Sequence, residues 1–517
     1  MKLLGRAPRT VHPARRSVRL QSYLLVYAAI AAFLLLAHGP ILHVPYYWDE
    51  IGQFIPASLD LYQTGAVIPH STVPNVHPPA VMAYLAGFWR IFGYSIAGTR
   101  VAMLLLAALG GIFTFLLAIE LARGAPGAPA LTALAFLCLS PLFFAQSLLA
   151  ELDMPAMCFT VLALLLFLQN RFRAAALAGV ALVLVKETGI VAPALFGCWL
   201  LFERRFRQAL WFLLPLAALC LWLLALKGAT GHWFGNRAFT EYNLSFPLNP
   251  VRLSFALLRR FYFLFVGTGH IVGTIAIAWA VRRMPLFRDR AWRVCAALVA
   301  LHVIAVSALG GAVLERYLLP VLPIVYTAFA ISLRALLPKW RTVATAALLI
   351  CLAAANFVNP PYPFPFENNL AFVSFVDLQL AAASAVEVRP GIVATTFPMA
   401  DALRRPEFGF VSEKRNVISL KEFRPSDIAP LRERRPDMMI VYDTTWDPLH
   451  LLSHEFPQWL LRTYYGYEPP MSPEAIARTL SMQIARRWER RGLSMSLLVR
   501  GPEVRPLPLA LLRENGL

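Results

Sequence analysis

The chain has 517 residues, 58% of them hydrophobic, and a mean hydropathy of +0.59. This composition is too apolar for a water-soluble globular protein and predicts a polytopic membrane protein. The net charge of +19 raises the question of a nucleic-acid partner, which the distribution of the charges answers below.

A helix that crosses a bilayer needs about 20 mostly apolar residues. The first such segment, 21–38, follows six basic residues, which predicts a cytoplasmic N-terminus. This segment is too long for a removed signal peptide and lacks a small-residue cleavage site, so we interpret it as an uncleaved anchor. The eleven predicted spans cover residues 21–38, 97–122, 129–147, 154–170, 173–186, 188–202, 208–226, 258–281, 291–309, 316–337 and 341–358.

If these spans alternate across the membrane, 20 Lys and Arg residues lie in or beside the cytoplasmic segments and 9 on the external side. This is the positive-inside bias, and it predicts an odd number of spans with the C-terminal region outside. Beyond residue 358, 19 basic residues are matched by 18 acidic ones. The basic character therefore reflects membrane topology, and no nucleic-acid partner is expected.

The acidic residues show the opposite distribution. Of the 11 Asp and Glu residues before position 358, eight fall on the predicted external side. Acidic residues contribute little to orientation, so this clustering indicates a site at that face. The eight are Asp49, Glu50, Asp60, Glu151, Asp153, Glu187, Glu241 and Glu315.

Two long loops are predicted on the external side. The first, 39–96, is rich in proline and contains an amphipathic segment, 80–92, which predicts a short helix on the membrane surface. The second loop, 227–257, is expected to fold over the first.

The Pro-rich segment 359–366 predicts a hinge. It divides the chain into an all-α transmembrane domain, 1–358, and a small α/β domain on the external side, 359–517. In this second domain the patterns predict strands at 391–397, 417–420, 438–442 and 495–499, and helices at 451–465 and 473–490.

All six cysteines lie inside predicted spans, so no disulfide framework is expected even in an oxidising compartment. The chain contains no CxxC or similar metal-ligand spacing. Glu151 and Asp153 could together hold a divalent cation, but one such pair without further ligands is a weak indication.

Asp49 and Glu50 follow the first span, next to Tyr46, Tyr47 and Trp48. As a purely structural feature they would be a solvated pair of acids at a helix end. The aromatic residues, however, form an interface belt that lowers the local dielectric. Burial there would raise the pKa of a carboxylate and make it a better base. We therefore predict a catalytic site at this pair.

Three further polar positions on the same predicted face are candidates. His77 could orient a substrate phosphate or an acid, although a His often hydrogen-bonds without catalysis. Arg100 could contact a phosphate or extend to a lipid headgroup. Asp153 could cap the fourth span ahead of Pro155, which is compatible with a functional role.

Charged residues interrupt the apolar pattern at Lys186-Glu187 and at Glu315-Arg316. Charges this close to hydrocarbon cost about 2.5–3.5 kcal/mol each on insertion scales, so they usually face a cavity or each other. Lys186 and Arg316 could bind an anionic phosphate, Arg316 by forking onto its oxygens. The structural alternatives are a self-satisfied turn at Lys186 and an Arg316 that reaches the headgroups.

Five segments in this order resemble the GT-C superfamily of membrane glycosyltransferases, in particular the bacterial family 39 relatives of protein O-mannosyltransferases and the aminoarabinose lipid A transferases. The segments are YYWDE (46–50), HPPAVMAYLAGFWRIFGYSIAGTR (77–100), AELDMP (150–155), VLVKETG (183–189) and ERYLLPVLP (315–323). The resemblance covers residues 20–325 and implies a GT-C fold. The C-terminal region supports it only in that members of this superfamily often carry an external C-terminal domain.

The resemblance implies a sugar donor linked to polyprenyl phosphate and an acceptor, whether glycan, lipid or protein, outside the bacterial inner membrane. Asp49 would be the general base that deprotonates the acceptor hydroxyl, so that attack inverts the anomeric carbon and expels polyprenyl phosphate. Glu50 and Asp153 would complete the catalytic set. The donor phosphate would contact Lys186, Arg316 and Arg100, and the substrates would contact His77, Glu151, Glu187 and Tyr317.

Relatives of this kind do not generally need a metal, so neither a metal nor another cofactor is expected, although a divalent cation is compatible with the acids. The chief alternative from another class is a transporter or flippase for a polyprenyl lipid or small molecule. Such proteins usually place charges near the bilayer midplane in paired repeats, whereas here the acids lie at span ends. An inactive scaffold that presents the C-terminal domain is a third alternative, against which the intact Asp49 argues.

Overall fold

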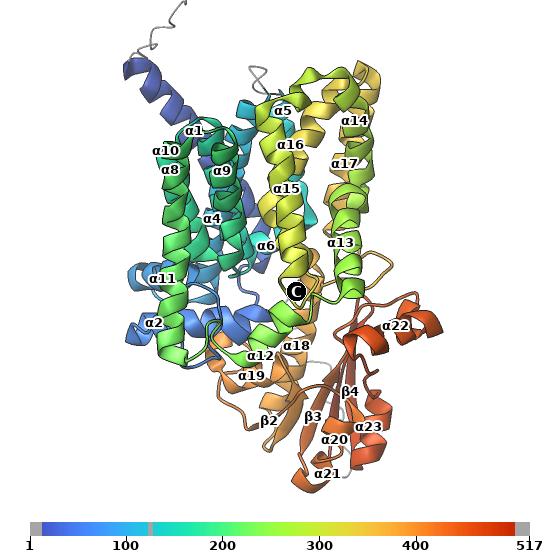
Figure 1. Cartoon of the computed structure of the whole chain (residues 1–517). Coiled ribbons are helices and arrows are strands. Elements are labelled where there is room, and N and C mark those ends of the chain that lie inside the picture. The colour runs from blue at the N-terminus through green and yellow to red at the C-terminus, as the bar shows by residue number, and fades with distance from the viewer. Residues whose placement is uncertain (1–12, 123–127, 502–517) are drawn as a thin grey trace, which may run out of the picture.

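The computed structural model describes residues 13–122 and 128–501. Long helices form a bundle, and a small sheet lies at one end of it, which we call the sheet side (Figure 1). The bundle contains α1 (Pro13–His38), α4 (Ile96–Leu121), α5 (Ala128–Leu139), α6 (Pro141–Leu148), α7 (Asp153–Leu168), α8 (Phe172–Val185), α9 (Val191–Phe202), α10 (Phe206–Ala209), α11 (Leu213–Thr230), α13 (Pro250–Phe265), α14 (His270–Arg283), α15 (Arg290–Ala308), α16 (Leu322–Ser332) and α17 (Pro338–Ala355).

Among the described residues, five helices are long and apolar enough to cross a membrane, or seven if each of two bent pairs counts as one span. Several shorter apolar helices, such as α7 and α8, pack among them. The chain is a multi-pass membrane protein with helices at every predicted span. The number of eleven crossings stays a prediction.

Each bent pair has an identifiable cause. Between α5 and α6 the axis turns by 63° at Ser140, where Pro141 begins the new helix and cannot continue the old one. Between α13 and α14 the turn is 41°, and Gly269 has a φ of +84° with no room for a Cβ beside Cys351. The predicted span over 258–281 therefore contains a break at Gly267–Gly269.

The first loop folds into a π-helical turn (Glu50–Phe54), α2 (Ile55–Thr64) and α3 (Ala80–Phe92), so the predicted amphipathic helix is confirmed. The second loop, which contains α12 (Arg237–Thr240), packs on the first as expected. Asn236 Nδ2 donates to the carbonyl of Pro74 at 2.8 Å. Gly235 has a φ of +85°, and a Cβ there would lie 2.6 Å from that same carbonyl oxygen.

Within the described residues, five strands form one mixed sheet in the order β2-β1-β3-β5-β4. β1 is parallel to β2 and β3, while β5 is antiparallel to β3 and β4. The helix α18 (Ala371–Glu387) packs on β4 and β5, and α19 (Met399–Arg404) packs on β1 and β2. The strands are β1 (Val393–Thr396), β2 (Val417–Leu420), β3 (Met438–Tyr442), β4 (Gln483–Arg490) and β5 (Leu493–Val499).

The four predicted strands are confirmed as β1, β2, β3 and β5, and the predicted helix at 451–465 corresponds to α22 (Glu455–Tyr465) after a short 3-10 turn. The predicted helix at 473–490 is wrong in its second half. α23 (Pro473–Leu480) ends at Ser481, which has a φ of +53°. The chain then pairs with β5 as the edge strand β4, because backbone pairing outweighs the helical pattern of the side chains.

Candidate active site

The acidic pair lies on a strained turn that the C-terminal region supports. Trp48 has a φ of +40°, a left-handed backbone that bulky residues rarely adopt. Such conformations cost about 1–3 kcal/mol and persist where the surrounding packing holds them. Tyr47 packs on Phe372 of α18, and Trp48 packs on Phe397 after β1, with ring centroids 5.7 and 5.5 Å apart. The C-terminal region therefore holds the turn that carries Asp49.

Asp49 and Glu50 face different surroundings. Glu50 has no exposed surface and accepts hydrogen bonds from the backbone N–H groups of Tyr47 at 2.8 Å and Ala150 at 2.6 Å. Its carboxylate also pairs with the equally buried Arg100, whose Nη2 lies 3.0 Å from Oε2. The side chain of Asp49, by contrast, is 23% exposed and lines a large cavity.

Three of the residues predicted for the site lie outside the cavity wall, and their roles stay predictions. Within the described part of the chain, Glu50, Arg100 and Glu151 do not line the cavity. The Nη atoms of Arg100 also donate to the carbonyls of Pro45 at 3.0 Å and Leu148 at 3.1 Å, so they are used within the protein. Glu50 and Arg100 therefore fasten the turn to α4, and Glu151 contacts the site only through a neighbouring arginine.

That neighbour is Arg316, which is 3% exposed in the 3-10 turn Glu315–Val321. Its guanidinium pairs with Asp49 and lies 2.6 Å from Glu151, 3.2 Å from Glu367 and 3.5 Å from Asp153. Four carboxylates around one guanidinium leave an excess of negative charge. Because such an excess is costly in a buried place, the cluster favours the uptake of protons.

Burial is the main cause of that uptake. It raises the pKa of Glu367 to about 7, against the opposing effect of Arg316 and with help from Asp49. It also raises the pKa of Glu151 well above its ordinary value, again against Arg316. Protons on these two acids reduce the repulsion, and Asp49 is the most exposed of the four carboxylates.

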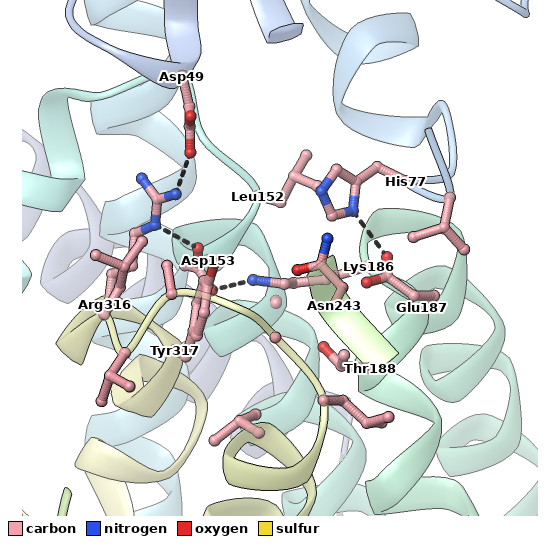
Figure 2. Close-up of a pocket in the computed structure, with 18 of the residues that line it drawn as sticks. Asp49, His77, Leu152, Asp153, Lys186, Glu187, Thr188, Asn243, Arg316 and Tyr317 are labelled. Atoms are coloured by element: carbon pink, nitrogen blue, oxygen red, sulfur yellow. Dashed lines mark hydrogen bonds and ion pairs between the residues drawn. The ribbon is translucent and has the colours of Figure 1, made fainter. Parts of the chain in front are cut away.

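Lys186, the residue that follows α8, is a second cation of the cavity. Lys186 has extended backbone angles (φ −150°, ψ 128°), so the helix stops there and its side chain reaches the cavity (Figure 2). Its Nζ lies 2.6 Å from Oδ1 of Asp153 and 4.3 Å from the ring centre of Tyr317. Asp153 thus bridges two cations of the site, Lys186 and Arg316.

His77 and Glu187 form another pair on the cavity wall, with Nδ1 and Oε2 3.0 Å apart (Figure 2). The backbone N–H of His77 donates to Asn75 at 3.0 Å. The ring of His77 also packs edge-on against Phe239 of the second loop, with centroids 5.6 Å apart. This pair therefore joins the first loop, the break after α8 and the second loop around the cavity.

The cavity has a volume of about 1050 Å³, at the upper end for ligand sites in proteins. Apolar side chains of α11 and α15, including Leu219, Leu223 and Val306, line its bundle side, and the charged residues gather near the loops. An amphiphilic substrate with a charged head and an apolar chain matches this lining. Some of the residues predicted for the site line this cavity, and their roles stay predictions. They are Asp49, His77, Asp153, Lys186, Glu187, Arg316 and Tyr317.

Several residues of the cavity wall were not predicted, among them Arg259, Glu367 and His302. Glu367 follows the Pro-rich segment and reaches Arg316 from beyond α17. His302 of α15 lines the cavity, and its Nε2 lies 2.7 Å from the carbonyl oxygen of Tyr317. The only sequence signal for Glu367 is a single acid beside the apolar Phe364 and Phe366. His302 interrupts the apolar stretch 294–306 of α15, so a search for polar residues inside predicted spans would find it.

In the part of the chain that the structure describes, no group of three or more His, Cys, Asp or Glu residues could hold a metal ion. The expectation that the protein needs no metal or cofactor stays a prediction.

The helical bundle and the small C-terminal sheet have the fold of a solved membrane protein, ArnT. The structure is similar to the crystal structure of ArnT from Cupriavidus metallidurans bound to undecaprenyl phosphate, with a TM-score of 0.55, 14% identity and coverage of 93% of this chain and 99% of ArnT. The apo state of ArnT also gives a TM-score of 0.55 and 14% identity, over 94% of this chain and 100% of ArnT.

The archaeal oligosaccharyltransferase AglB from Archaeoglobus fulgidus is less similar, with a TM-score of 0.46 and 11% identity over 82% of this chain and 69% of AglB. No family profile and no curated protein matches the chain. At these identities the likeness to ArnT establishes the fold alone.

Proposed function

We propose that the protein is an inverting glycosyltransferase that moves a sugar from a polyprenyl-phosphate donor to an acceptor hydroxyl. The observation that carries this proposal is the partly exposed Asp49 in one cavity with Lys186 and Arg316. The reaction requires a base that takes the proton of the acceptor hydroxyl and cations that stabilise the leaving phosphate. The GT-C fold, and the undecaprenyl phosphate bound to ArnT in its crystal structure, support the choice of donor.

In the proposed reaction, the carboxylate of Asp49 takes the proton of the acceptor hydroxyl as its oxygen attacks the anomeric carbon. The bond between that carbon and the phosphate oxygen breaks, and its electron pair leaves with the polyprenyl phosphate. A positioned general base contributes typically about 10²–10⁴-fold. Asp153, held between Lys186 and Arg316, is the alternative base.

Lys186 is the cation best placed to stabilise the leaving phosphate. Arg316 is surrounded by four carboxylates, whereas Lys186 forms an ion pair with one, Asp153, among the described residues and also lies over the ring of Tyr317. An ammonium group has three donors, so Lys186 can keep its contact with Asp153 and still donate to a phosphate. Arg316 then acts mainly by holding the carboxylates in place.

For the topology we propose a cytoplasmic N-terminus, an external cavity and an external C-terminal region in a bacterial inner membrane, which the positive-inside bias supports. We also propose 1–358 as the catalytic transmembrane domain and 359–517 as an α/β domain. Residues of the second part, such as Glu367 and Thr444, line the cavity, so this domain would complete the wall of the site.

The experiment is a transfer assay with purified protein in nanodiscs, a panel of polyprenyl-phosphate sugars, and glycan, lipid and peptide acceptors. Wild type is compared with Asp49→Asn and with Asp60→Asn. Asp60 lies in the same loop but accepts hydrogen bonds from the N–H groups of His70 and Ser71, both at 2.8 Å. Asn can still accept there, so this variant is a matched control.

We expect the wild type and Asp60→Asn to release polyprenyl phosphate, and Asp49→Asn to lose at least about 100-fold in turnover while still binding donor. Undiminished turnover in Asp49→Asn would show that Asp49 is not the general base, and Asp153 would then be the candidate for that role. Movement of the lipid-linked sugar across the bilayer without any transfer would favour the transporter instead.

A further inference from the structure

Two helical turns at the end of the bundle opposite the sheet are built alike. The sequence Arg-Phe-Arg occurs at 171–173, at the start of α8, and again at 205–207, at the start of α10. The residue before each motif has a left-handed backbone, with φ of +59° at Asn170 and +58° at Arg204. The backbone hydrogen bonds also match, because each motif begins with an N–H bonded to a carbonyl five residues earlier.

The two turns contact each other. Arg205, the first arginine of the second motif, donates from Nη1 to Oδ1 of Asn170 at 3.2 Å. Its guanidinium also lies over the ring of Phe172, 4.6 Å from the centroid. One arginine of the four therefore fastens the turns together.

The other three arginines surround a hollow of about 520 Å³, which Asn170, Gln208 and Trp211 also line. Arg171, Arg173 and Arg207 are exposed, and none of them has a carboxylate partner among the described residues. Glu203, the acid closest in the chain, instead accepts from Arg290 at 2.5 and 3.0 Å. The hollow thus gathers three unpaired positive charges.

The surroundings of the hollow are those of a membrane interface. Arg173 lies over the indole ring of Trp211 at 4.8 Å, an arrangement that keeps the guanidinium edge free for an anion. Phe202, Phe206 and Leu210 beside it are 87%, 61% and 63% exposed, as lipid-facing side chains of a membrane helix would be. α8 joins this hollow to the proposed catalytic cavity, because Phe172 at its start lines the hollow and Lys186 after its end lines the cavity.

We propose that this hollow binds the phosphate headgroup of an anionic membrane phospholipid. Guanidinium groups fork onto phosphate oxygens, and basic pockets between membrane helices bind anionic headgroups. A free phosphate ion shares the charge but not the acyl chains, for which the exposed Phe206 and Leu210 offer an apolar path. The inference is independent of the sugar-transfer chemistry at the sheet side.

The test is native mass spectrometry of the purified full chain titrated with phosphatidylglycerol, with phosphatidylcholine and with inorganic phosphate. Wild type is compared with Arg173→Gln/Arg207→Gln. The matched control is Arg282→Gln/Arg283→Gln at the end of α14, where Arg283 stacks on Trp279 at 3.7 Å outside the hollow. Both double variants remove two charges and one arginine–tryptophan contact.

We expect wild type to retain phosphatidylglycerol at least about tenfold more tightly than phosphatidylcholine, and the Arg173/Arg207 variant to lose at least about tenfold in that affinity. The control should stay within about twofold of wild type. Equal losses in the two variants would overturn the site, and displacement of the lipid by millimolar phosphate would overturn the lipid as its ligand. If the double variant misfolds, the exposed Arg207→Gln alone should show a smaller loss of the same kind.

Discussion

Oδ1 of Asp153 lies 2.6 Å from Nζ of Lys186, and Oδ2 of the same carboxylate lies 3.5 Å from Nε of Arg316. One buried acid thus links two cations of the cavity. The two cations differ in their surroundings, because Arg316 forms ion pairs with three further carboxylates, whereas Asp153 is the carboxylate within ion-pair distance of Lys186 among the described residues.

The first prediction concerns Lys186. Replacing it with Gln removes the ammonium that we propose contacts the donor phosphate, and hydrogen bonds to charged groups contribute about 1.5–3 kcal/mol. We expect donor affinity to fall by about 10- to 100-fold, measured as the dissociation constant for a polyprenyl-phosphate sugar in nanodiscs. Lys227→Gln is the matched control, since Lys227 also stacks on an aromatic ring, that of Trp233 at 4.1 Å, and does not line the described cavity. Equal losses for both lysines would contradict the assignment.

The second prediction separates the two neighbouring acids. Glu50→Gln leaves the buried charge of Arg100 without its carboxylate, and breaking a buried ion pair typically costs about 3–5 kcal/mol. Asp49→Asn removes one of four carboxylates around Arg316, so its effect on stability should stay below about 1 kcal/mol. Unfolding in detergent, followed by thermal or denaturant melting, measures both. A Glu50→Gln protein as stable as wild type would show that Glu50 is not a structural anchor.

Much of the fold could be predicted from the sequence because hydrophobic periodicity and length report helices directly. The surface helix α3, the contact between the two loops and four of the five described strands were all predicted. The break between α13 and α14 and the strand β4 were not. Both depend on contacts with distant parts of the chain, Cys351 in the first case and β5 in the second.

Some of the residues that line the cavity could be predicted from the sequence and others could not. Charges inside apolar segments led to Lys186 and Arg316, because such charges need a cavity or a partner. The local sequence could not show that the side chains of Asp49 and Glu50 face different surroundings. Their directions depend on the left-handed backbone of Trp48, a conformation that is improbable for this residue type. Glu367 reaches Arg316 only once α17 has returned the chain to the sheet side, so no sequence spacing reveals it.

The third prediction is a dependence of stability on pH that Glu367 causes. Its pKa is raised from 4.5 to about 7 by burial, so the unfolded chain releases this proton at a lower pH than the folded protein. The contribution to stability is therefore complete below about pH 4.5 and is lost as the pH rises towards 7. The melting temperature of wild type, measured relative to that of Glu367→Gln, should fall between pH 5 and about 7.5 and stay constant at higher pH. The melting temperature of the control Glu413→Gln, a change at an exposed residue, should vary with pH as that of wild type does. If Glu367 were ionised at every pH tested, the melting temperature of Glu367→Gln would also follow that of wild type.

The fourth prediction tests whether the C-terminal region holds the catalytic turn. A Cβ at Gly52 would lie 2.9 Å from the ring of Phe397, which packs on the strained Trp48. Gly52→Ala should push that ring aside and release part of the roughly 1–3 kcal/mol of strain, so that Asp49 loses its orientation. We expect kcat to fall by about tenfold with little change in KM, because the donor contacts of Lys186 are untouched.

Gly87→Ala is the control for this fourth prediction, since a Cβ at that helical glycine meets nothing within 4 Å. The smaller side chain of Phe397→Leu makes room for the new methyl group, so adding it to Gly52→Ala should recover part of the lost turnover. Neighbouring residues that act through one contact show such coupling, whereas independent ones add. Strict additivity of the two changes in kcat would mean that Phe397 does not transmit the effect, and that the turn around Trp48 keeps Asp49 in place without help from the C-terminal region.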